Sequence, residues 1–180
     1  MRAALAIATM LVASTANGDP LPPGSIGGAI GFASGTGADA KRLGFGYMLG
    51  AQAAWQPMDT NQRINWAAKW SAVFGTMYGA DAARIGSELL TLKMDLMPGV
   101  RIRPGTNPSR YLTLRAGGVL LRTDQVIPSK MTRSFVGAIA SIGIDQYVSG
   151  LLVSVDLRYS MIGTGPAELG LVIGLAKTGP

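Results

Sequence analysis

The chain is 180 residues long, which is the size of a single domain, and it carries a formal net charge of +6. It contains neither cysteine nor histidine, which excludes disulfide bonds, thiolate chemistry and histidine-dependent catalysis. Only 14% of the residues are charged and the mean hydropathy is +0.28, so the composition is too apolar for an ordinary soluble domain. We expect no cofactor, no metal ion and no nucleic-acid partner.

The first residues have the pattern of a secretory signal peptide. A short charged start precedes an apolar run over residues 3–13, and small residues at 14–16 offer a cleavage site. The run is too short to cross a membrane as a helix. We therefore predict a signal peptide over residues 1–16, an extended proline-rich leader over 17–25 and one barrel domain over 26–180. The alternative is a short hydrophobic N-terminal helix that stays in the fold.

Past this start, apolar and polar residues alternate with the period of a β-strand. The pattern is clearest over residues 63–79, where Trp66 and Trp70 share one face and Lys69 lies on the other. Short, turn-rich joins separate the alternating segments, as expected for consecutive hairpins. We predict an all-β fold, an eight-stranded antiparallel up-and-down transmembrane β-barrel. Its expected strands are Ile26–Ser34, Arg42–Gln56, Arg63–Gly79, Glu88–Arg103, Arg110–Arg122, Thr132–Gln146, Leu151–Met161 and Ala167–Lys177.

Alternation alone also fits a soluble, lipocalin-like ligand-binding barrel, whose apolar face points inward. Here the strands are long, and Trp66 and Tyr78 are spaced by roughly 30 Å along the barrel axis for a strand tilted by about 40°, which suits two membrane interfaces. The opposite face is small and charged, which fits the narrow interior of an eight-stranded membrane barrel. We therefore expect the apolar face to meet lipid, with interfacial aromatic residues at Trp55, Trp66, Trp70, Tyr78 and Tyr159.

Several charged residues fall on the face that is expected to point inward. They come from five of the expected strands and can meet across the lumen, where paired charges would form a salt-bridged plug. The alternative is a continuous water path through a narrow pore. The predicted lumen ion network consists of Lys69, Lys93, Asp95, Arg115, Asp156, Arg158 and Glu168.

The last expected strand carries a local motif, in which Glu168 and Gly170 are followed by the hydrophobic residues Ile173 and Leu175. With this motif and the strand pattern, the chain resembles the small eight-stranded outer-membrane barrels of Gram-negative bacteria, of the OmpA/OmpX type. The resemblance implies a bacterial outer-membrane location and insertion by the β-barrel assembly machinery, with these four residues as assembly signal. The chain departs from the family pattern at its end, where an aromatic residue is usual and Pro180 stands instead.

The residue inventory argues against an enzyme. The enzymatic families among small outer-membrane barrels use an active-site histidine, and this chain has none. Asp95 and Asp156 could form a carboxylate pair, but both have a basic neighbour in the sequence and are expected to be ion-paired. The short outward joins disfavour an adhesin. We expect a non-enzymatic barrel with a structural or accessory role in the envelope, with a narrow pore or small-solute channel as the alternative.

Basic residues are expected at both rims of the barrel. With a periplasmic N-terminus, one set lies near the outward joins, where it would bind lipopolysaccharide phosphates or remain ordinary solvated charge. Arg101, Arg103 and Arg110 are expected to cluster at the periplasmic rim, where they would meet a protein partner of the envelope. Outer-membrane lipids are the remaining expected partner. The outward set comprises Lys41, Arg42, Arg84, Arg122, Lys130 and Arg133.

Overall fold

A computed structural model describes residues 24–36, 44–56, 63–78, 89–107, 109–125, 131–162 and 167–179. These residues form strands and the turns between them, and none of them builds a helix long and apolar enough to cross a membrane. The strands are β1 (Gly24–Gly35), β2 (Phe45–Trp55), β3 (Ile64–Tyr78), β4 (Leu89–Ile102), β5 (Arg110–Gln125), β6 (Met131–Val148), β7 (Leu151–Met161) and β8 (Ala167–Thr178).

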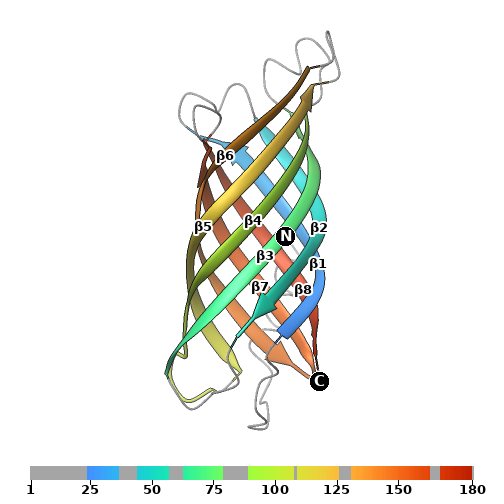
Figure 1. The fold of residues 1–180 in the computed structure, drawn as a ribbon. Helices are drawn as coiled ribbons and strands as arrows, with labels where there is room; N and C mark the ends of the chain where they lie inside the picture. The colour runs from blue at the N-terminus through green and yellow to red at the C-terminus, as the bar shows by residue number, and fades with distance from the viewer. Residues whose placement is uncertain are drawn as a thin grey trace.

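The eight strands form one closed antiparallel barrel in which each strand pairs with the next and β1 pairs with β8 (Figure 1). Closure leaves no strand with an unpaired edge. β1 begins and β8 ends at the same end of the barrel, the lower end in Figure 1. We call it the terminal end, and the opposite one the far end. The predicted fold class, an eight-stranded antiparallel β-barrel, is confirmed.

The strand boundaries lie close to those expected, with a few differences. β1 begins at Gly24, inside the segment expected to be a leader, and β2 begins only at Phe45. β6 runs on to Val148 because the following turn needs only Ser149 and Gly150, which both have positive φ. Such a two-residue turn matches the twist of the paired strands. The expected signal peptide, most of the leader, and the strand ends at Arg42, Gly79 and Glu88 lie outside the described residues.

Burial alternates along the strands, with apolar side chains outside and the charged side chains, many polar or small ones and three apolar clusters inside. On β3, Trp66 is 71% exposed while Lys69 is 1% exposed, although the second is charged. The outward face is apolar over the middle of every strand. Charged and hydroxyl side chains fill the place where a soluble lipocalin-like barrel would have its apolar cavity.

Inward glycines allow neighbouring strands to approach each other closely. At Gly117 on β5, an added Cβ atom would overlap the carbonyl oxygen of Leu96 on β4. At the outward neighbour Gly118, an added Cβ atom meets nothing within 4 Å. Glycine inside a strand often marks such a close backbone approach. The same overlap with a neighbouring strand's backbone recurs at Gly27, Gly50, Gly75, Gly99 and Gly137.

Candidate functional site: a charged network in the lumen

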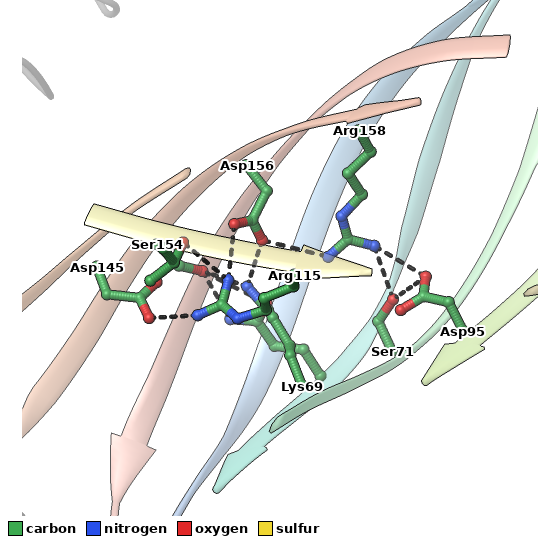
Figure 2. A network of polar contacts seen from close by, with 10 residues as sticks. Lys69, Ser71, Asp95, Arg115, Asp145, Ser154, Asp156 and Arg158 are labelled. Atoms are coloured by element: carbon green, nitrogen blue, oxygen red, sulfur yellow. Dashed lines mark hydrogen bonds and ion pairs between the residues drawn. The ribbon is translucent and has the colours of Figure 1, made fainter. Parts of the chain in front are cut away.

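The carboxylate of Asp156 on β7 is the centre of the polar interior. Its Oδ2 lies 2.6 Å from Lys69 Nζ of β3, and its Oδ1 lies 3.0 Å from Arg115 Nη1 of β5. Arg158, two residues further along β7, approaches Oδ2 with Nη2 at 3.4 Å. Figure 2 shows how these three cations converge on one carboxylate. All four side chains are buried, so each depends on the others for charge compensation.

Two further carboxylates extend this cluster along the lumen. Arg115 Nη2 lies 2.5 Å from Asp145 Oδ2 on β6, and Arg158 Nη1 lies 2.9 Å from Asp95 Oδ2 on β4. Ser71 adds a hydroxyl that donates to the same Asp95 oxygen at 2.6 Å (Figure 2). Positive and negative groups therefore alternate across five strands. We call this set the lumen network: Lys69, Asp95, Arg115, Asp145, Asp156 and Arg158.

A second ion pair lies nearer the far end. Lys93 of β4 contacts Glu168 of β8, and the hydroxyl of Ser160 bonds to both, accepting from Lys93 Nζ at 3.1 Å and donating to Glu168 Oε1 at 3.1 Å. This pair connects β4 with β8, which lie on opposite sides of the barrel. Together with the lumen network it accounts for all seven residues of the predicted ion network, which the structure places inside the barrel.

The prediction from the sequence omitted some members of this site. Asp145 is absent from the predicted network because the alternation of β6 is weak, with isoleucine on the inward face at Ile139 and on the outward face at Ile142. Ser71 and Ser154 are also absent from the predicted network, although Ser154 accepts a hydrogen bond from Lys69 Nζ at 2.9 Å. Both serines occupy inward positions of the alternating pattern, and this was the signal in the sequence that could have identified them. The pairing of Arg115 with Asp145 follows from the stagger between strands.

Arg101 was expected at the periplasmic rim, but its side chain lies inside the barrel. It is 1% exposed, and its guanidinium carbon lies 4.4 Å from the ring centre of Tyr111. Its Nη1 donates to Oε1 of Gln56, which also accepts from the hydroxyl of Tyr147 at 2.5 Å. The guanidinium can be buried because an aromatic face and an amide oxygen replace water around it. Arg103 and Arg110 are half-buried at the terminal end.

The chemistry available to the lumen is limited by this pairing. Arg158 contacts both Asp95 and Asp156, so the carboxylate pair considered from the sequence is joined through a cation. Among the described residues, no group of three or more acidic side chains is arranged to hold a metal ion. Apolar side chains also occupy the interior, and one buried cluster toward the far end contains Met97, Val119, Leu121, Ile139 and Ile162.

The expected interfacial aromatic residues face outward at different heights. Trp55 and Trp66 lie near the terminal end and Tyr159 near the far end, all exposed. Trp70 is also exposed, but it lies halfway along β3, opposite Leu96 of β4. The side chain of Tyr78 lies outside the described part of the chain.

The residues of the expected assembly signal lie on β8 next to the closing seam. Glu168 is buried in the lumen and Leu175 is exposed on the outer surface, with Gly170 and Ile173 half-buried between them. β8 pairs with both β1 and β7, so this motif belongs to the strand that closes the barrel.

Two of the cations expected at the outward rim are described, and both are exposed. Arg122 pairs with Asp124 at 3.6 Å, and Arg133 lies on the neighbouring strand β6. Lys41, Arg42, Arg84 and Lys130 lie outside the described residues.

Comparisons with solved structures identify the class to which this fold belongs. The attachment invasion locus protein Ail of Yersinia pestis, solved with the heparin analogue sucrose octasulfate, is 11% identical with a TM-score of 0.59, covering 88% of this chain and 98% of Ail. Neisserial surface protein A is 11% identical with a TM-score of 0.63, covering 87% and 97%. The outer membrane protein OprG of Pseudomonas aeruginosa is 14% identical with a TM-score of 0.57, covering 90% and 95%.

The chain therefore has the fold of the small eight-stranded outer-membrane β-barrels. At these identities the likeness concerns the fold alone. No protein-family model matches the sequence, and no curated protein matches it.

Proposed function

We propose that this protein is an integral barrel of the bacterial outer membrane with a structural or accessory role in the envelope, and that it is not an enzyme. The observation that carries the proposal is the reversed polarity of the barrel. Trp66, Leu96 and Leu175 are exposed over the outside, while paired charges are buried within. An apolar outer surface of this kind is stable in lipid and aggregates in water. The shared fold with known outer-membrane proteins supports the same location.

Export and assembly complete this proposal. Residues 1–16 would be removed as a signal peptide during export, and the motif from Glu168 to Leu175 would direct insertion by the barrel assembly machinery. Fractionation of cells that express the full chain tests the location. We expect the protein in the outer membrane, with faster gel mobility before boiling than after it. Recovery from the soluble periplasm with unchanged mobility would contradict the proposal.

We further propose that the lumen is a closed, ion-paired plug. The lumen network spans the interior from β3 to β7, and the apolar cluster around Met97 and Leu121 fills it toward the far end. Purified protein in planar bilayers is therefore expected to show no discrete current steps at a conductance above that of the bare bilayer.

A narrow pore is the second candidate, and one observation favours it. Four buried polar atoms of the lumen network have no hydrogen-bond partner within the protein: Asp95 Oδ1, Asp145 Oδ1, Arg115 Nε and Arg158 Nε. Buried polar atoms of this kind are normally satisfied by ordered water, and a connected file of water would conduct ions. Reproducible open states in the same bilayer recordings would favour the pore over the plug.

Among partners, we propose the lipids that surround the barrel, including lipopolysaccharide at the far rim. Arg122 and Arg133 supply exposed cations there for phosphate groups. Replacing both with glutamine should weaken lipopolysaccharide retention during purification. Equal retention by the variant and the wild type would reduce these residues to ordinary solvated charge.

A further inference from the structure

The charges buried inside the barrel do not balance. Among the described residues, four buried carboxylates face five buried cations. The four carboxylates and four of the cations form the lumen network and the pair of Lys93 with Glu168. The fifth cation is Arg101, at the terminal end, and its partners are the neutral side chains of Gln56 and Tyr111. The terminal end therefore carries an excess of positive charge from within.

Further arginines lie at the same end of the barrel as this buried cation. Arg63 is exposed at the start of β3, and the backbone N–H of Arg103 donates to its carbonyl oxygen at 2.9 Å. Arg110, at the start of β5, is half-buried, and its Nε donates to the neutral Oε1 of Gln146 at 2.9 Å. We call Arg63, Arg103 and Arg110 the terminal arginine patch.

The patch borders the apolar outer surface. Ile64 follows Arg63 directly and is 58% exposed, and Trp66 lies one outward position further on. An arginine next to an exposed tryptophan suits the boundary between lipid tails and headgroups, where the charged group reaches the phosphates. A surface for an acidic protein would not need an apolar belt at its edge.

We propose that the terminal arginine patch binds the phosphodiester headgroup of an anionic phospholipid in the periplasm-facing leaflet. Guanidinium groups recognise phosphate oxygens through charge-assisted hydrogen bonds, and the buried charge of Arg101 strengthens the field at this rim. This inference rests on the proposed function, because it requires the barrel to be inserted with its terminal end toward the periplasm.

Lipid selectivity in vesicles tests the proposal. The full-length mature barrel is inserted into phosphatidylcholine vesicles, and its association with spin-labelled phosphatidylglycerol is compared with that of spin-labelled phosphatidylcholine. We expect the wild type to prefer phosphatidylglycerol and the Arg63→Gln/Arg103→Gln variant to lose about tenfold of this preference. The Lys177→Gln variant removes an exposed cation at the same end, on β8 and outside the patch, and should keep it.

Each other outcome overturns the inference. A preference that survives in Arg63→Gln/Arg103→Gln, or that falls equally in Lys177→Gln, places the lipid site elsewhere. Binding of soluble polyglutamate by the wild type, without phosphatidylglycerol preference, would assign the patch to an acidic protein partner. Alkaline washing of the same vesicles distinguishes a failure of this inference from a failure of the proposed function. Inserted protein without lipid preference overturns only this inference, whereas protein that washes off overturns the outer-membrane barrel as well.

Discussion

At the scale of single residues, Asp156 contributes most to the lumen because three cations share its carboxylate. Burying ions costs desolvation free energy, so such a cluster adds little net stability over an apolar core of the same volume. Instead, the cluster determines which register the strands adopt. A one-residue slip of β7 against its neighbours would move Asp156 and Arg158 from the lumen to the lipid-facing surface.

Asp156→Asn should therefore destabilise the barrel strongly. The substitution leaves Lys69, Arg115 and Arg158 with too little negative charge, and we expect a loss of about 3–5 kcal/mol in the free energy of unfolding. Urea titration of the protein in phosphatidylcholine vesicles measures it. Asp124→Asn is the matched control, because its pair with Arg122 is exposed and is worth less than about 1 kcal/mol. Equal losses in the two variants would contradict a cooperative network.

The face of the strand on which each residue lies was predictable from the sequence, whereas its ion-pair partner was not. The period of two places Lys69 and Asp156 on the inner face from the sequence alone. Which carboxylate meets which cation depends on the stagger of strands that are far apart in the chain. Arg101 shows a second limit, because its burial depends on contact with Tyr111 of β5 and with Gln56, which follows β2.

At the scale of elements, glycines determine how closely the strands coil around the narrow interior. The strands themselves were predictable because their alternation is long and their joins are rich in turn residues. The differences fall at strand ends such as Val148, where a tight turn lets the ladder continue beyond the alternating pattern. The need for glycine at close approaches was not visible in the sequence, since Gly117 and Gly118 are adjacent and only one is required.

Gly117→Ala and Gly118→Ala should change the free energy of unfolding in opposite directions. The first places a methyl group against the backbone of Leu96 and should cost on the order of 1–3 kcal/mol. The second adds a methyl group in open space and should stabilise the barrel by about 0.4–1 kcal/mol through the unfolded chain. Urea midpoints in vesicles measure both effects. Similar midpoints for the two variants would show that β4 and β5 are further apart than described.

At the scale of the whole molecule, the polarity of the two surfaces decides which solvent the barrel tolerates. The outward face carries apolar side chains over the middle of every strand, and the inward face carries the charges. In a soluble barrel this order is reversed, and an exposed position accepts a charge at little cost. A charge introduced on the outer surface therefore distinguishes the two environments.

Leu96→Arg and Ile64→Arg compare two depths at equal exposure. Both residues are 58% exposed, but Leu96 lies in the middle of β4 and Ile64 begins β3. In a bilayer, arginine should cost about 2–4 kcal/mol at the middle position and about 0–1 kcal/mol at the end. Unfolding in phosphatidylcholine vesicles measures both free energies. Small and equal costs would mean that lipid does not surround Leu96.

The seam between β1 and β8 has a consequence for how the chain is made. Ser25 pairs with Thr178, so the barrel closes only after almost the whole chain has left the ribosome. Until then every partial sheet has two bare edges, and its charged face has no opposite wall to provide counter-ions. Pairings this distant in sequence also form slowly. The first strand must therefore stay available for pairing until the last one has been made, so the two ends of the chain set the moment at which the barrel is complete.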